Sequence, residues 1–266
     1  MRTTRGKSFR FGVLDLSTVL IMIFLLLPIV IIVLFSFNPT SATVFPMRGF
    51  TTKWYREVLR NEIFISALIN SVYVGLMVSC VSVFIGVLAS FALTRYRFRF
   101  KEMMSYIVLL PITLPAIILG ISLLSFFASV LGISRSLLTV TLSHVVFVTP
   151  FVVLIMNARL DKFDITIEEA AKDLGANALQ TFRYVTFPLI RPSLIGTMML
   201  SFGLSFDEFL VTFFVVGRKN TLPIVIWGML RRGVSPTVNV IATMVLAISI
   251  TLIIIANRIA KLRTLY

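Results

Sequence analysis

Long runs of apolar residues alternate with short polar segments along almost the whole of this chain. Each run holds few charges and is long enough to cross a bilayer core, which takes roughly 20 helical residues. The runs cover about residues 13–37, 67–94, 104–130, 137–157, 192–217 and 236–257. Such continuous runs lack the alternation of membrane β-barrel strands, so helices are the spanning element that fits. The pattern predicts an all-α membrane protein with six transmembrane helices, in which residues 1–266 form one transmembrane domain.

Composition supports the membrane class, and the distribution of basic residues predicts how the helices are oriented. The chain is 58% hydrophobic and 14% charged, which is more apolar than a soluble domain. If the N-terminus is cytoplasmic, most of the 25 Lys and Arg residues fall in cytoplasmic segments. The clearest of these segments is the short basic turn from Arg95 to Lys101. The positive-inside rule therefore favours a multi-pass protein with both termini in the cytoplasm.

The net charge of +14 does not indicate a nucleic-acid-binding protein. The basic residues are spread over every loop, and no folded soluble region could carry a binding groove. Membrane lipid headgroups and protein partners account for the charge more simply.

No catalytic or metal-binding group is indicated. The single histidine, His144, lies inside the fourth run, where a hydrogen bond to a neighbouring helix is expected. The segment from Gly6 to Ser8 looks like the end of a phosphate-binding loop, but Met1 stands where the first glycine would be. The chain is therefore expected neither to be an enzyme nor to bind ATP through that motif.

A polar, helix-forming insert at residues 158–191 separates the fourth and fifth runs. Thr166 followed three residues later by Glu169 fits a capping box, which predicts a helix that starts near Ile167. Gly175 stands where this helix must end and where a positive φ is expected.

The same insert has three further features: a possible ion pair, a shallow surface of alanines and a second predicted helix. Glu168 and Lys172 stand four residues apart and can pair along one helix face. Ala170 and Ala171 leave a shallow patch that another protein can approach closely. A second helix over residues 177–185 is expected to stop at Pro188.

These residues form a recognisable motif. Glu169-Ala170-Ala171 is followed by Gly175 and, ten residues later, by a Val-Thr-Phe-Pro ending at Pro188. This resembles the EAA loop of ATP-binding-cassette (ABC) importer permeases, E-A-A-x3-G-x9-I-x-L-P, with Val for Ile and Phe for Leu. The resemblance implies the type I ABC importer permease fold, with residues 158–191 as the EAA coupling loop.

The resemblance also implies which residues contact the ATPase and which subunit binds ATP. Glu169, Ala170, Ala171 and Gly175 would contact the ATPase. ATP and Mg would be bound by that ATPase, and this chain would hold no cofactor.

Within that superfamily the chain is most similar to the second, C-type permease of spermidine/putrescine importers. The similar segments are Glu169–Ala176, Leu204–Glu208, Leu222–Ile224 and Gly233–Asn239. The resemblance implies a sister permease, two ATPase subunits and an extracytoplasmic substrate-binding protein at a bacterial inner membrane.

Three other functions fit the sequence less well. A permease of the same type could carry a phosphonate, an Fe(III) complex or another small solute. A membrane-embedded enzyme would need convergent polar residues in several spans, which the sequence lacks. An ion channel would not need a glycine-hinged cytoplasmic helix with an alanine patch.

Two adjacent acids, Asp207 and Glu208, fall near the middle of the fifth run. An ionised acid at the bilayer centre costs at least about 2.5–3.5 kcal/mol, so such groups face a protein interior or a water-filled route. Helical neighbours point about 100° apart, so one of the two would face any given cavity. We expect one of them to line the translocation path or gate for a cationic substrate. The alternative is a structural pair with the sister subunit.

The expected outer segments are basic. Their charged residues are Arg48, Lys53, Arg56, Arg60, Arg135, Arg218, Lys219, Arg231 and Arg232 against Glu57 and Glu62. Such a field suits an acidic carrier protein, and Arg231 and Arg232 are the candidate docking residues. The alternative is scattered solubilising charge.

Overall fold

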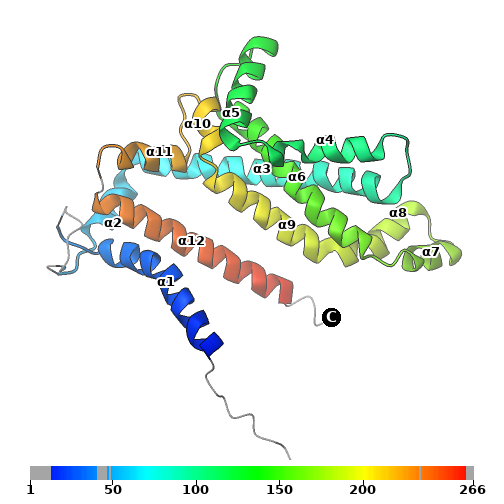
Figure 1. Cartoon of the computed structure of the whole chain (residues 1–266), viewed down its shortest axis with the longest axis horizontal. Helices are drawn as coiled ribbons and strands as arrows, with labels where there is room; N and C mark the ends of the chain where they lie inside the picture. The colour runs from blue at the N-terminus through cyan, green and yellow to red at the C-terminus, as the bar shows by residue number, and fades with distance from the viewer. Residues whose placement is uncertain (1–12, 41–46, 48, 234, 262–266) are drawn as a thin grey trace, which may run out of the picture. The chain divides into compact units, whose positions relative to one another are not determined.

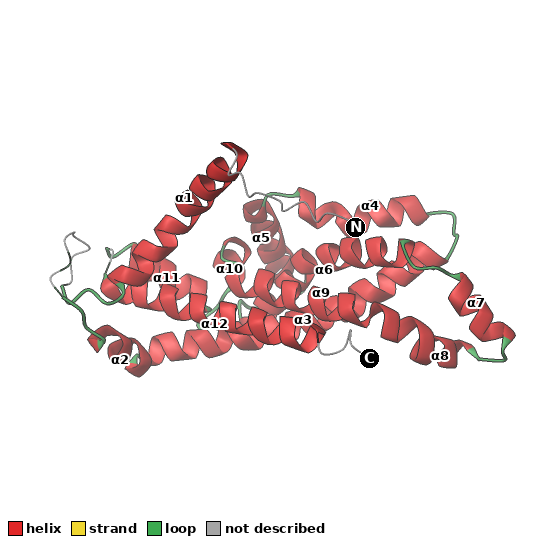
Figure 2. Cartoon of the chain, turned by 90° about the horizontal axis from the view of Figure 1, so that it is seen from below, coloured by secondary structure: helices red, strands yellow, loops and turns green. Residues whose placement is uncertain are grey.

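The computed structural model describes residues 13–40, 47, 49–233 and 235–261, and the regular elements of this part of the chain are all helices (Figure 2). In chain order the elements are α1 (Val13–Phe35), α2 (Lys53–Arg60), α3 (Glu62–Arg95), α4 (Lys101–Thr113), α5 (Ala116–Ser125), η1 (Phe126–Val130), α6 (Leu137–Asp161), α7 (Thr166–Asp173), α8 (Ala178–Thr181), η2 (Phe182–Thr186), α9 (Phe187–Asp207), α10 (Leu210–Val215), α11 (Leu222–Leu230) and α12 (Pro236–Lys261). They form two compact units: residues 1–60 with 229–266, and residues 61–228. Whether the whole chain acts as one domain stays a prediction.

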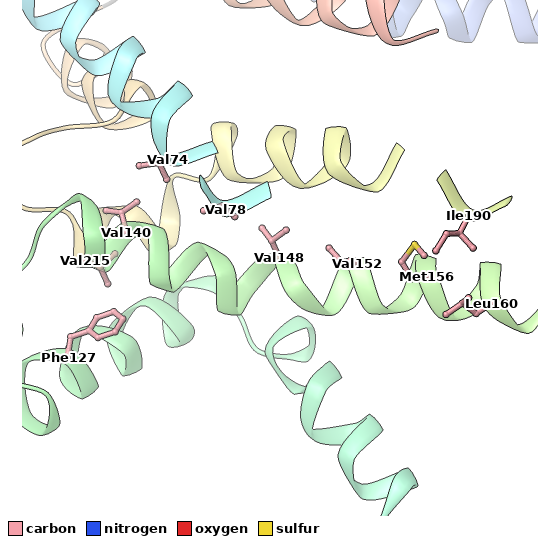
Figure 3. Close-up of a cluster of buried hydrophobic side chains, with 10 residues drawn as sticks. All are labelled: Val74, Val78, Phe127, Val140, Val148, Val152, Met156, Leu160, Ile190 and Val215. Carbon is pink, nitrogen blue, oxygen red and sulfur yellow. The ribbon is translucent and has the colours of Figure 1, made fainter. Parts of the chain in front are cut away.

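The larger unit is built on α3, α6 and α9, which pack along one another (Figure 1). Its buried apolar cluster consists of Val74, Val78, Phe127, Val140, Val148, Val152, Met156, Leu160, Ile190 and Val215 (Figure 3). Gly86 on α3 lies against Val152 on α6, where any Cβ would overlap the valine side chain. A small residue is therefore required at this contact between the two long helices.

The smaller unit consists of α1, α2 and α12, with α1 and α2 each packed against α12. The segment between α1 and α2 is fixed by side chains: Trp54 Nε1 donates to the carbonyl of Asn38 at 2.8 Å. The hydroxyls of Ser36 and Tyr55 lie 2.7 Å apart. These bonds hold the start of α2 close to the end of α1.

Four described helical segments are long and apolar enough to span a membrane, namely Leu14–Phe35, Glu62–Arg95, Leu137–Asp161 and Ala178–Asp207. A fifth span results if α4 and the segment Ala116–Val130 are counted together, although they are bent by 106°. In the sixth run the described apolar helix, Pro236–Thr251, is shorter than these. The prediction of six spans is therefore not confirmed, whereas the all-helical membrane class is.

The third predicted span is wrong as a single continuous helix. Leu114 has an extended backbone, with φ −81° and ψ 136°, and it ends α4 directly before Pro115. A proline disfavours helical geometry in the residue before it, so the break follows from the sequence Leu-Pro at this point.

The fifth predicted span, residues 192–217, is wrong as one continuous helix, and so is the predicted helix stop at Pro188. Helical structure runs without interruption from Ala178 through Pro188 to Asp207, so the proline does not stop the helix. The π turn of η2 precedes it, with the Phe187 N–H bonded to the carbonyl of Phe182. Pro188 is the second residue of α9, directly after this π turn, in which the hydrogen-bond ladder is already shifted by one residue. The break comes instead at Glu208, whose φ of −70° and ψ of 111° separate α9 from α10.

Candidate functional site

The helix that carries the EAA motif, α7, begins in a different way from the prediction. The predicted capping box between Thr166 and Glu169 does not form. Instead, Asp164 Oδ1 accepts hydrogen bonds from the Thr166 backbone N–H at 3.0 Å and from its hydroxyl at 2.8 Å. These two bonds stabilise the carboxylate and lower the pKa of Asp164 below its usual value. The sequence signal for this start was Asp-x-Thr, a common side-chain-to-backbone turn.

The end of α7 is as predicted, because Gly175 has a φ of +89°. The Ala176 N–H bonds to the carbonyl of Ala171 at 3.0 Å, and the Gly175 N–H bonds to that of Lys172 at 2.9 Å. This is a Schellman motif, which satisfies the last carbonyls of a helix and needs a residue that tolerates positive φ. The glycine therefore fixes the angle at which the chain leaves α7.

A second short helix follows directly. Asn177 and Gln180 form a reciprocal capping box, each side-chain oxygen accepting the other residue's backbone N–H at 2.9 Å. The expected second helix thus begins where the sequence placed it. Because α8 runs on through η2 into α9, the motif loop is continuous with a membrane helix.

The motif residues form an exposed surface. Glu169, Ala170 and Gly175 are exposed and Ala171 is half-buried, so three of the four residues are accessible to a partner. Leu174 is 90% exposed beside them. An exposed leucine next to a flat alanine suits a protein contact, and motif reasoning missed it.

Further exposed apolar side chains, which the motif does not mark, are Leu179 and Tyr184. They lie on α8 and η2, directly after the Gly175 turn. The sequence does mark these two residues as a possible contact surface, because they are large apolar residues in an insert that is otherwise polar.

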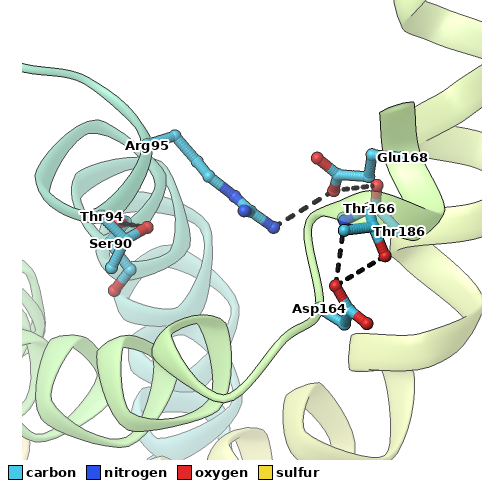
Figure 4. A network of polar contacts seen from close by, with 7 residues as sticks. All are labelled: Ser90, Thr94, Arg95, Asp164, Thr166, Glu168 and Thr186. Atoms are coloured by element: carbon cyan, nitrogen blue, oxygen red, sulfur yellow. Dashed lines mark hydrogen bonds and ion pairs between the residues drawn. The ribbon is translucent and has the colours of Figure 1, made fainter. Parts of the chain in front are cut away.

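Glu168 has a different partner from the expected one. Its Oε1 lies 3.3 Å from Arg95 Nη2 at the end of α3 and accepts a 2.7 Å hydrogen bond from the hydroxyl of Thr186 (Figure 4). The predicted pairing with Lys172 is therefore wrong. The carboxylate instead joins three segments that are distant in sequence.

The two membrane acids lie at the break between α9 and α10 rather than inside a helix. Asp207 is the last residue of α9 and is exposed. Glu208 follows it, and its Oε1 accepts the backbone N–H of Val211 at 2.9 Å, so it caps the first turn of α10. The prediction that both acids lie in mid-helix is wrong, and the two carboxylates have different surroundings.

Aromatic rings flank this break. Phe202 and Phe206 stack at 5.6 Å in the last turns of α9. On the other side, the ring of Phe209 lies 5.2 Å from that of Trp227 and 5.7 Å from that of Phe213. Aromatic rings, whose faces can attract a cation, are therefore carried by the residues on both sides of the break.

His144 is buried beside the same break, as expected of a membrane histidine with helix partners. Its Nδ1 lies 2.8 Å from the hydroxyl of Ser205 on α9, and its Nε2 lies 2.7 Å from that of Thr212 on α10. One ring thus bridges the two helices that the break separates.

The candidate docking residues Arg231 and Arg232 lie in the turn between α11 and α12, and both are exposed. The turn ends at Gly233, whose φ is +117°. Within the same unit, α2 carries Lys53, Arg56 and Arg60 at spacings that place them on one helix face. Arg48, which also belongs to the predicted basic exterior, lies outside the described residues.

Comparison with known proteins agrees with this fold. The family model for the binding-protein-dependent transport system inner membrane component matches residues 82–263. The chain is 38% identical over 242 residues to the spermidine/putrescine transport system permease protein PotC of Escherichia coli (strain K12), which covers 91% of each chain. It is 36% identical over 230 residues to the putrescine transport system permease protein PotI of the same organism, covering 84% of this chain and 82% of that one.

Solved structures share the same architecture. A chain of a bacterial ABC transporter involved in the import of the acidic polysaccharide alginate matches with a TM-score of 0.68 at 17% identity, covering 98% of this chain and 99% of that one. A chain of the MetNI methionine ABC transporter matches with a TM-score of 0.62 at 22% identity, covering 76% of this chain and 99% of that one. The fold is thus that of ABC transporter permeases. Since the family model and the relatives both span most of its length, the chain belongs to the family of binding-protein-dependent transport system inner membrane components.

Proposed function

We propose that this chain is one permease subunit of an ATP-driven importer of polyamines. The observation that carries the proposal is the 38% identity to a spermidine/putrescine permease over 91% of both chains. The chain would therefore form half of a translocation path and would depend on other subunits for energy and for delivery of the substrate.

The energy would come from two ATPase subunits, one of which would dock on the surface formed by Glu169, Ala170 and Gly175. Three features support this role. The surface is exposed, its shape is set by the Schellman turn at Gly175, and it is continuous through α8 with the membrane helix α9. ATP and Mg would be held by those subunits. Both termini of the permease would lie on the same, cytoplasmic side.

The path would be completed by a sister permease, with Asp207 at its wall. In the described part of the chain this exposed carboxylate makes no hydrogen bond, whereas that of Glu208 is committed to the backbone of α10. A carboxylate among aromatic faces offsets the lost hydration of an ammonium group. On the outer side, Arg231 and Arg232 would receive an acidic substrate-binding protein.

The test is uptake in a bacterial strain that cannot import polyamines. The chain would be expressed with an ATPase, a sister permease and a binding protein from its own organism, and labelled spermidine and putrescine would be offered. ATP-dependent uptake that excess unlabelled polyamine abolishes is the expected result. Uptake of a phosphonate or a ferric complex in place of polyamine would overturn the substrate assignment while leaving the permease assignment intact.

A further inference from the structure

The carboxylate of Glu168 is the point where three segments of the larger unit meet. Its Oε1 lies 3.3 Å from the guanidinium of Arg95, the last residue of α3. The same oxygen accepts a 2.7 Å hydrogen bond from Thr186, the last residue of η2 (Figure 4). The side chains of Arg95 and Glu168 are only 16% and 13% exposed, so little water competes for these bonds.

A second contact holds Arg95 in place. Its guanidinium lies over the ring of Phe163, 5.0 Å from the ring centroid. Phe163 is buried in the segment that joins α6 to α7. One arginine at the end of α3 therefore contacts both the start of the coupling loop and the helix that carries the motif.

The other residues of α7 contribute little to holding this helix against the membrane helices. None of its eight residues is buried, so apolar packing does not fasten it to the membrane helices. A charge-assisted hydrogen bond is about twice as strong as a neutral one. We infer that the Glu168 carboxylate is the main non-covalent attachment of α7.

The position of Glu168 on α7 separates this attachment from the motif surface. Glu168 and Ala170 are two residues apart, which places them about 200° from each other around the helix axis. Ala170 is exposed, while Glu168 is covered by Arg95 and Thr186. One face of α7 is thus free for a partner while the opposite face is tied to α3.

We propose that Arg95 and Glu168 form a mechanical link that carries displacement of α7 into α3. This rests on the proposed function, in which an ATPase moves α7. The backbone already connects α7 through α8 to α9, and the Arg95–Glu168 link adds a second route into α3. Since α3 packs along both α6 and α9, the two routes would move the core helices together. In this proposal both residues act by positioning the helices that they join.

The first experiment measures exchange of backbone amides in the assembled complex by mass spectrometry. Glu168→Ala should raise exchange in the peptide that covers residues 162–176 on the order of tenfold, the effect expected when a charged hydrogen bond is lost. The control is Asp173→Asn, which alters an exposed carboxylate on the same helix. Unchanged exchange in Glu168→Ala would overturn the link, and this readout does not require that polyamine be the substrate.

The second experiment measures polyamine molecules imported per ATP hydrolysed. Glu168→Ala and Arg95→Met should each lower this ratio on the order of tenfold while the complex still assembles and hydrolyses ATP. Arg97→Gln, which removes an exposed charge from the same basic turn, should leave the ratio unchanged. The charge-swapped double variant Arg95→Glu with Glu168→Arg should recover part of the ratio, since a simple loss of packing would not be rescued.

The outcomes separate the two proposals. Loss of transport with no recovery in the swapped pair would overturn the link. An unmutated complex that imports no polyamine would instead overturn the proposed substrate, and the exchange experiment would still decide the link.

Discussion

The Nε2 atom of His144 lies 2.7 Å from Oγ1 of Thr212, so a side chain of α6 reaches the helix beyond the break at Glu208. Thr212 donates its hydroxyl hydrogen to the carbonyl of Glu208 at 2.7 Å, so toward the ring it can only accept. His144 therefore carries its hydrogen on Nε2 and accepts at Nδ1 from the hydroxyl of Ser205. This chain of three bonds holds α9 and α10 against α6 where the main chain leaves helical geometry.

Replacing His144 with Leu should destabilise the protein by about 1–3 kcal/mol, because the buried hydroxyls of Ser205 and Thr212 both lose a partner. Thermal unfolding of the purified complex in detergent measures this. The control on the same helix is Thr149→Val, which removes only a bond to the carbonyl of Val145. A loss of stability in the control as large as that in His144→Leu would count against the bridging role.

A β-branched residue at Gly175 should uncouple transport from ATP hydrolysis. No atom lies within 4 Å of a Cβ built at this position, so the cost of Gly175→Val comes from the φ of +89° and not from a clash. Left-handed geometry costs an L-residue about 1–2 kcal/mol, enough to reorient the Schellman turn. Gly175→Asn should be milder, since asparagine tolerates this region. The measurement is uptake against ATP hydrolysis, and full coupling in Gly175→Val would contradict the prediction.

A large cationic side chain at position 170 should weaken binding of the ATPase subunit. Ala170 is exposed, so Ala170→Arg should leave the internal packing of the loop intact. Ala171→Arg would also disturb a half-buried position and is the less specific test. We expect Ala170→Arg to weaken co-purification of the ATPase on the order of tenfold, the effect of about 1.4 kcal/mol. Undiminished co-purification would show that this face of α7 is not the contact.

The features that the sequence predicted correctly are those set by neighbouring residues. The positive φ of Gly175 and the start of α8 at Asn177 both depend on residues within one helical turn. The burial of His144 follows from a polar residue in a long apolar run. Local backbone chemistry and hydrophobic pattern are sufficient for these features.

The features that it missed depend on contacts between distant residues. Lys172 was the nearest cation to Glu168 along the helix, whereas the actual partner, Arg95, lies 73 residues away in sequence. The break at Glu208 does not lie beside a proline, since Pro192 of the same apolar run lies well inside α9. It is stabilised by the cap on Val211 and by a histidine from α6. No local pattern reports such partners, so a continuous helix was the natural interpretation.

Reversing the charges of Arg231 and Arg232 should weaken docking of the substrate-binding protein. Both side chains are exposed, so Arg231→Glu with Arg232→Glu should change the surface potential without altering the fold. Affinity should fall on the order of tenfold at low salt, and less at high salt, where the Debye length shortens to about 3 Å. The control is Arg97→Glu in the basic turn after α3, on the opposite predicted side. An affinity that the double reversal leaves unchanged at low salt would rule out docking at this turn.

Removing the charge of Asp207 and removing that of Glu208 should have different effects on the stability of the protein. Glu208→Gln keeps an oxygen that can accept the Val211 N–H, so the cap on α10 should survive. Glu208→Ala removes the cap and should cost about 1 kcal/mol of stability. Asp207→Asn changes an exposed group with no hydrogen bond in the described part of the chain, so stability should be unaffected.

Polyamine uptake should therefore separate a path residue from a structural one. If Asp207 lines the route, Asp207→Asn should lower uptake on the order of tenfold, because an amide replaces the charge that offsets the lost hydration of an ammonium group. Assembly with the sister permease and the ATPase should be unchanged, as co-purification of the complex would report. Glu208→Gln should reduce uptake less, since its carboxylate is already engaged by the backbone of α10. Reduced assembly with normal uptake per assembled complex would mean that Asp207 acts at the subunit interface. Full uptake by both variants would remove these carboxylates from the path.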